Sequence, residues 1–184
     1  TGLLPSNHGL IYYPDPGRLQ ENIITLGGIL QKQGYLTRGF YGAGYVSPRF
    51  GFGKGFHQYT SRGNNFEDNI QLCLNWLEKA KNFRFMLFMH GFNCHNPFKP
   101  SPEFDVYFKE YKGSYSVEKL YHEYELPENQ DDMKHIIAKY DATILGADFI
   151  LGKLFNKLEE LKIFDKTIIM IASDHGHGFG EHES

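Results

Sequence analysis

The strongest chemical signal in the sequence is an Asp-His pair that directly follows an apolar run. Asp174 and His175 come after residues 167–172, and Gly176 follows them. A carboxylate and an imidazole that leave a buried strand together can both face one cation, while a glycine lets the backbone turn away sharply. Three more ligands or proton donors stand in the same loop: His177, Glu181 and His182. The pattern predicts one side of a divalent-metal site, and the alternative is an ordinary strand-end turn in which Asp174 caps the next helix.

A second polar group follows the apolar run at residues 85–89. His95 stands in a loop that Pro97 and Pro100 stiffen, so its imidazole can be presented at a small ordering cost. We expect it to bind an anionic ester or to protonate a leaving alcohol. The alternative is a solvated surface histidine. His90, closer to the run, is interpreted as a structural residue that orients the loop.

Two further groups are weaker candidates. Asp141 and Asp148 lie two turns apart on a predicted helix, where a solvated face explains them better than a pair of catalytic carboxylates. Lys54 and His57 lie in or beside the glycine-rich stretch at residues 42–55. That stretch has no Gly-Lys-Ser/Thr and is not a phosphate-binding P-loop, although either side chain could contact an anion.

The elements that must position these residues alternate between helix and strand. Helical spacing of apolar residues covers residues 19–33, 65–81 and 128–162. Short apolar runs predict strands at residues 36–41, 85–89 and 167–172, the last two buried on both faces. This alternation favours an α/β fold with a mostly parallel sheet flanked by helices. Such sheets bind ligands beyond the carboxyl ends of their strands, which is where His95 and Asp174 both stand.

Composition excludes several classes of protein. The 184 residues are 41% hydrophobic and 22% charged, with a net charge of −3. That balance is typical of a globular domain and gives no electrostatic basis for nucleic-acid binding. No apolar run approaches the roughly 20 residues of a membrane span. Cys73 and Cys94 do not make a disulfide framework. Both ends look cut, so the sequence predicts nothing about localisation.

Several segments, taken in order, resemble the sulfatase family of the alkaline-phosphatase superfamily. The similar segments are Thr-Gly-x-x-Pro-x-x-His-Gly at residues 1–9, Gly-Tyr-x-Thr at 34–37, Gly-Phe-x-x-Gly-Phe at 51–56, His-x-Pro-aromatic at 95–98, the long helix at 140–152 and Ser-Asp-His-Gly with Gly-Glu-His at 167–182. They span almost the whole chain. The last segment is the most specific, and together they make the resemblance strong.

The resemblance implies an alkaline-phosphatase-like fold and hydrolysis of a sulfate ester, a sulfated glycan being one such substrate. Asp174 and His175 would be metal ligands, and His95 would contact the sulfate or assist departure of the alcohol. Lys99 and His182 would join His95 in binding the substrate. The resemblance also implies one divalent metal, with Ca²⁺ expected first. Mn²⁺ and Zn²⁺ are alternatives because His175 supplies a nitrogen ligand.

The chain also departs from the family pattern. The family nucleophile, a formylglycine made from Cys or Ser in a Cys/Ser-x-Pro-Ser-Arg motif, would stand just before Thr1. The other metal ligands are also absent, so we expect residues 1–184 to be an internal part of one N-terminal catalytic domain and to be inactive alone. Residues 42–45 lack the common Gly-Lys-Trp-His, and His177 stands where Glu is common.

Two alternative functions remain open from the sequence. A phosphodiesterase or phosphoglycerol transferase of the same superfamily also accepts an Asp-His pair at its metal. A non-catalytic descendant would keep the fold and bind a glycan or a partner. Residues 102–127 are aromatic and charged without a clear period, and we expect them to form a surface excursion. Aromatic residues in it could line a sugar subsite or form a packed lid.

Overall fold

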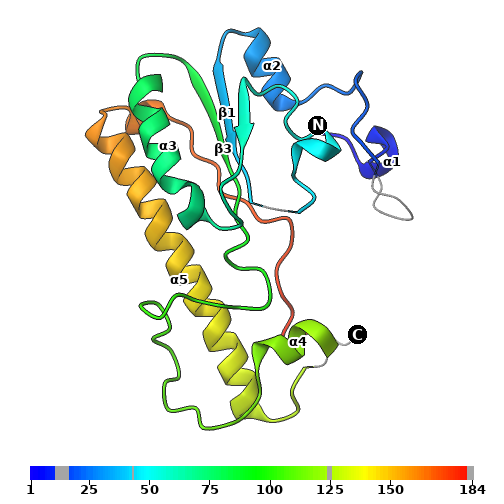
Figure 1. Ribbon diagram of the computed structural model, residues 1–184, viewed down its shortest axis with the longest axis vertical. Coiled ribbons are helices and arrows are strands. Elements are labelled where there is room, and N and C mark those ends of the chain that lie inside the picture. The colour runs from blue at the N-terminus through cyan, green and yellow to red at the C-terminus, as the bar shows by residue number, and fades with distance from the viewer. Residues whose placement is uncertain (11–16, 43, 124–125, 182–184) are drawn as a thin grey trace. The chain divides into compact units, whose positions relative to one another are not determined.

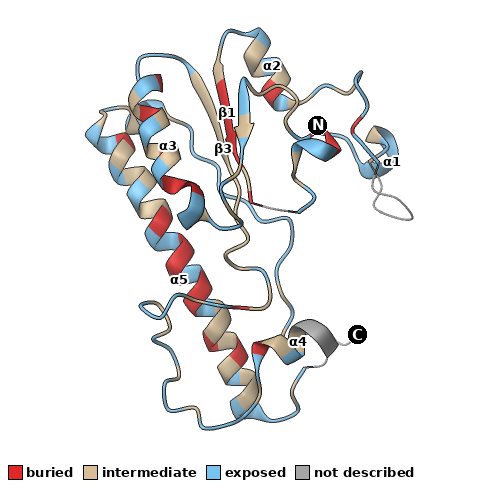
Figure 2. Ribbon diagram, in the orientation of Figure 1, coloured by how far each residue is buried: buried red, intermediate tan, exposed pale blue. Residues whose placement is uncertain are grey.

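The computed structural model describes residues 1–10, 17–42, 44–123 and 126–181, and it gives no account of the side chains of residues 121–123. These residues fall into two compact units, Thr1–Phe92 and Asn93–Ser184. Figure 1 traces both units along the chain, and Figure 2 shows where each is buried. No helix in the described part has the length and apolarity that crossing a bilayer requires.

The first unit contains a three-stranded parallel sheet (Figure 1). Its order is β2-β1-β3, with β1 at Leu36–Phe40, β2 at Gln58–Thr60 and β3 at Phe85–Met89. In the β1–β3 pair, Leu36 stands opposite Phe85 and Phe40 stands opposite Met89. Phe40 is fully buried in the central strand. The predicted strands at residues 36–41 and 85–89 are confirmed, but β3 is half-buried rather than covered on both faces. It also pairs on one side only within this sheet.

Helices α2 (Leu26–Lys32) and α3 (Phe66–Ala80) both contact β1, and the short α1 spans Pro5–His8. Helix α3 matches its prediction, since the Asp68 carboxylate accepts the Asn65 amide at 2.9 Å and closes the first turn. Its buried face includes Ile70, Cys73 and Leu77 at helical spacing. Burial raises the pKa of the Cys73 thiol to about 12, so Cys73 is a core residue rather than a nucleophile.

Helix α2 begins later than the predicted start at residue 19. The Leu19 amide donates to the Phe50 carbonyl at 3.0 Å, which holds this stretch against the 3-10 turn η1 (Pro48–Phe50). Helix α2 starts only after Thr25, whose hydroxyl accepts the Gly28 amide at 3.0 Å as an N-cap. This backbone contact between distant parts of the chain therefore leaves residues 19–25 outside the helix that the sequence predicts.

The second unit is built on α5 (Gln130–Glu160), a helix close to the predicted range of 128–162. Asn129 caps it by accepting the Asp131 amide at 2.7 Å. The core of this unit consists of Phe98, Val117 and Ile136, with Tyr115, Leu120, Tyr140 and Phe179 packed against it. One face of α5 is accordingly buried along much of its length (Figure 2).

Residues 102–127, the expected surface excursion, contain the short helix α4 (Val117–Glu123). Val117 belongs to the core, and a Cβ at Gly146 of α5 would lie 3.1 Å from the Phe104 ring. Parts of this segment therefore pack closely on α5. That residues 1–184 belong to one catalytic domain stays a prediction.

The predicted buried strand at residues 167–172 is wrong for the described structure. The segment has no regular secondary structure after the 3-10 turn η2 (Phe164–Lys166), and Ile168 is 91% exposed and Met170 84% exposed. None of the backbone hydrogen bonds found among the described residues involves residues 168–172. A strand needs a neighbour for its backbone groups, and here the apolar run has none within the described residues.

Candidate functional site

His95 lies in a loop of the second unit that is anchored by a buried aromatic residue. Phe98, three residues further on, is 1% exposed, and its ring centroid lies 5.1 Å from that of Tyr140 on α5. The exposed His95 ring has its Nδ1 against the Asn96 carbonyl. A carbonyl only accepts, so His95 Nδ1 donates this hydrogen bond.

The Asp174–His175 turn is held mainly by its own local hydrogen bonds. The Asp174 carboxylate accepts the His175 amide at 3.1 Å, and the Ser173 hydroxyl donates to the His175 carbonyl. His175 Nδ1 lies 2.8 Å from the Gly176 carbonyl and must donate to it, which leaves Nε2 unprotonated in the neutral ring. That tautomer is the one that a metal-ligating histidine needs.

His177 connects this turn with the His95 loop. Its ring centroid lies 5.0 Å from Phe98 and 5.6 Å from Tyr140, and its ring also hydrogen-bonds the Cys94 backbone. The centroid of His177 is 5.8 Å from that of His175 and 6.4 Å from that of His95. The structure thus brings three imidazoles, two of them predicted site residues, into one cluster.

The electrostatics of this cluster disfavour a positive charge on His177. Burial lowers its pKa first, and the neighbouring imidazoles of His175 and His95 lower it further. A neutral His177 packs on Phe98 without a desolvation penalty for charge. It therefore serves as a packed spacer between two more exposed histidines.

Comparison with known proteins agrees with this arrangement of motifs. The sulfatase family model matches residues 1–184. The chain belongs to the sulfatase family. The predicted family is confirmed, and so is the predicted α/β fold with a parallel sheet flanked by helices. Comparison with curated proteins gives no match.

Two solved structures resemble this sulfatase-family chain. The lipoteichoic acid synthase LtaP from Listeria monocytogenes has a TM-score of 0.55 and 20% identity, over 78% of this chain and 34% of that one. An alkaline-phosphatase-superfamily protein from Vibrio parahaemolyticus has a TM-score of 0.43 and 20% identity, over 74% of this chain and 32% of that one. The chain thus spans about a third of the length of these two structures.

The family is generally metal-dependent, and the Asp174–His175 turn offers two donors. Asp174 Oδ2 and His175 Nε2 are 3.9 Å apart, and both side chains are exposed. Typical metal–oxygen and metal–nitrogen bonds add up to roughly 4.2 Å for zinc, so one cation can touch both atoms. No group of three or more His, Cys, Asp or Glu residues that could hold a metal occurs in the described part of the chain. The turn supplies two possible donors, and the assignment of Asp174 and His175 as metal ligands stays a prediction.

Lys99 and His182 were the other predicted substrate contacts. Lys99 Nζ pairs with the Glu118 carboxylate of α4 at 3.1 Å, and this contact is the main reason that the pKa of Glu118 is lowered. Lys99 is therefore partly engaged, although its side chain is still 64% exposed. His182 lies outside the described residues. Both assignments stay predictions.

The remaining candidate residues either lie on a solvent-exposed face or make contacts that hold the fold together. Asp141 and Asp148 are exposed on α5, as a solvated face requires. His90 donates its amide to the Phe40 carbonyl at 2.9 Å, and its ring lies 5.2 Å from Phe92. His57 Nδ1 lies 2.8 Å from the Thr37 hydroxyl, which ties it to β1.

The sequence predicts His177 as a further ligand or proton donor but does not predict its packing role. The relevant signal is the spacing of Ile136 and Tyr140, four residues apart on one face of α5, where His177 and Phe179 pack. That spacing identifies a helix face but does not name the residues that cover it.

Proposed function

We propose that the protein is a metal-dependent sulfuric ester hydrolase whose site includes His95 and the Asp174–His175 turn. The observation that carries the proposal is the histidine cluster, in which His177 keeps the two loops close together. Membership of the sulfatase family supports a hydrolase or transferase acting at an ester. A sulfate ester, including one on a glycan, is the substrate class that we propose.

In this proposal each side chain has a separate task. Asp174 and His175 hold the divalent metal, which when bound supplies positive charge beside the sulfate oxygens. His95 binds a sulfate oxygen or gives a proton to the leaving alcohol. The formylglycine nucleophile would come from outside residues 1–184, and Lys99 would add positive charge at the substrate.

The direct test is turnover of 4-nitrophenyl sulfate by the whole protein. Replacing His95 by Gln should lower kcat/KM by about 10²- to 10⁴-fold, the usual contribution of an acid-base group. The matched control is His135→Gln, since His135 lies on α5 and stacks on Tyr111 rather than on the cluster. Asp174→Asn should lower the bound metal content measured on the purified protein. Turnover by His95→Gln that equals the wild type would contradict the proposal.

A phosphodiesterase or phosphoglycerol transferase is the second candidate. One observation favours it: the fold resembles that of a lipoteichoic acid synthase. The Asp174–His175 pair is compatible with either function. The ratio of kcat/KM for bis-4-nitrophenyl phosphate to that for 4-nitrophenyl sulfate decides between them. A ratio well above one, with no formylglycine in the protein by mass spectrometry, would replace the sulfatase proposal. A folded protein that turns over neither would support the non-catalytic binding function.

A further inference from the structure

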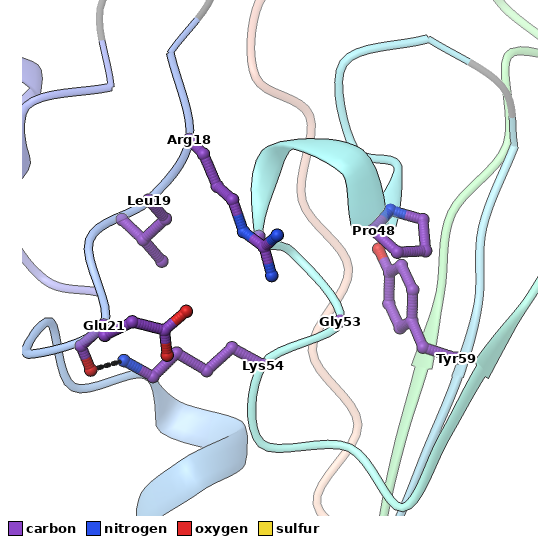
Figure 3. Close-up of a pocket in the computed structure, with 8 residues that line it drawn as sticks. Arg18, Leu19, Glu21, Pro48, Gly53, Lys54 and Tyr59 are labelled. Atoms are coloured by element: carbon purple, nitrogen blue, oxygen red, sulfur yellow. Dashed lines mark hydrogen bonds between the residues drawn. The ribbon is translucent and has the colours of Figure 1, made fainter.

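A pocket in the first unit is lined by none of the residues discussed above as catalytic or metal-binding. It has a volume of about 370 Å³, within the range of small-molecule sites, and its walls include Arg18, Leu19, Glu21, Pro48, Lys54 and Tyr59. Figure 3 shows that the Arg18 and Glu21 side chains both extend into the space between their own segment and the loop that carries Gly53. Two opposite charges thus face one cavity.

The Lys54 ammonium group fixes one wall of this pocket. It donates to the backbone carbonyls of Gln20 at 3.3 Å, Ile23 at 2.6 Å and Glu21 (Figure 3). An ammonium group has three donors, and these three carbonyls use all of them. Lys54 therefore contributes positive charge to the pocket but no free hydrogen-bond donor, which corrects its earlier interpretation as a candidate anion contact.

The opposite wall is also fixed before any ligand arrives. The Tyr59 hydroxyl donates to the Val46 carbonyl at 2.8 Å, and the Tyr59 ring stacks on Tyr41 with centroids 4.8 Å apart. At Gly51, whose φ is 92°, a Cβ would lie 2.8 Å from the Leu19 Cβ. A glycine is required there by the close approach of the two segments and by the left-handed backbone. A pre-formed cavity loses little conformational entropy on binding.

Arg18 and Glu21 are the two charged side chains of the pocket that the fold leaves uncommitted. Within the described part of the chain neither makes an ion pair or a side-chain hydrogen bond, and the two do not pair with each other. A guanidinium group presents a planar fork of donors that fits two oxygens of a carboxylate, sulfate or phosphate. A carboxylate accepts hydrogen bonds from hydroxyl groups.

We propose that this pocket binds a small hydroxylated molecule that carries one oxyanion, with the oxyanion at Arg18 and a hydroxyl group at Glu21. With Lys54 included, the pocket carries two positive charges and one negative charge, so its net charge favours an anion. A bare anion would bind Arg18 but would leave the Glu21 carboxylate without a hydrogen-bond donor. A neutral polyol would leave Arg18 unused, so the ligand needs both groups.

The test titrates the protein with glucuronate and with glucose 6-phosphate while ¹⁵N–¹H NMR follows the Leu19 and Gly53 amides. Glucose lacks the oxyanion, and acetate and inorganic phosphate lack the sugar hydroxyls. At least one hydroxylated anion should bind at least tenfold more tightly than all three of these. The better of the two distinguishes a carboxylate from a phosphate ligand.

Variants locate the binding. Arg18→Ala should weaken binding of the better ligand at least tenfold, and Glu21→Gln should reduce its advantage over the simple anion. The matched control is Arg62→Ala, which removes another exposed arginine outside the pocket. Because Arg18 has no partner in the described fold, its loss should not unfold the protein. The proposal is overturned by no binding at millimolar ligand, by unchanged binding in Arg18→Ala, or by an equal loss in Arg62→Ala.

Discussion

Two short segments of this protein are similarly apolar in sequence but adopt different structures. Residues 85–89 form β3 and pair in parallel with β1 from Leu36 to Phe40. Residues 167–172 form no strand, and Ile168 is 91% exposed. Both runs precede a polar loop with a predicted site residue, His95 or Asp174.

The difference shows that apolar content alone does not make a strand. A helix satisfies its backbone groups within one segment, whereas a strand takes its hydrogen bonds from a neighbour. β3 has β1 beside it, and its Phe88 ring packs 6.1 Å from Phe56 and 6.2 Å from Tyr59. Residues 167–172 have no such neighbour in the described part of the chain, and the side chains of Ile168, Met170 and Ile171 are largely exposed to water.

Hydrogen exchange should show the largest contrast between the two runs. Backbone amides paired in the β1–β3 ladder should exchange at least on the order of a thousandfold more slowly than unfolded chain, since they open only with the sheet. Amides of residues 168–171 should exchange within about tenfold of the unfolded rate. Equal protection of the two runs in native-state exchange would contradict the unpaired state of the second run.

A pair of glycine variants tests the packing around each run. A Cβ on Gly39 in β1 would overlap the Tyr59 ring, whereas one on Gly176 would meet nothing within 4 Å. Gly39→Ala should therefore lower the free energy of unfolding by about 1–3 kcal/mol, the usual cost of overpacking. Gly176→Ala should change it by less than about 0.5 kcal/mol. Urea denaturation measures the free energy of unfolding of both variants. An equal decrease in the two variants would contradict the packing argument.

His177 tests how the polar loop after the second run is held. His177→Ala removes ring packing on Phe98 and the hydrogen bond to Cys94, and should cost about 1–2 kcal/mol of unfolding free energy. His177→Phe keeps a ring without the donor and should lose less. NMR of the His95 and His175 rings should show greater mobility in His177→Ala. Unchanged stability and ring signals would mean that His177 does not join the loops.

The smallest effect is a pH dependence within the second unit. Burial lowers the pKa of His135, with the Lys139 charge as a further cause, so the folded protein binds this proton less well than the unfolded chain. The associated stability is present above the unfolded pKa of about 6.5 and is lost as the pH falls below it. His135→Phe keeps the stacking on Tyr111, whose centroid is 3.9 Å away, and removes the titration.

This variant should therefore lose less stability than the wild type between about pH 7.5 and about pH 5.5, given the unfolded histidine pKa. Thermal unfolding at both pH values measures the difference. An identical loss in the two proteins would show that His135 does not contribute to it.

The sequence by itself determined the elements whose hydrogen bonds are local. Apolar periodicity and end signals placed α3 and α5 within two residues of their observed ends, because i to i−4 bonds and capping side chains lie within the same segment. The ordered motifs, ending in Ser173 to Gly176, determined the family. Strand β1 was also placed, with one residue too many at its end.

Only the tertiary structure decided which distant residues meet. The bond from Leu19 to Phe50 shortened α2, three carbonyls took up the Lys54 ammonium group, and the packing of His177 on Phe98 brought three imidazoles together. Each contact joins residues far apart in the chain or in separate elements, so no local pattern encodes it. For the same reason the sequence could mark residues 167–172 as strand-forming but could not supply the neighbouring strand that they need.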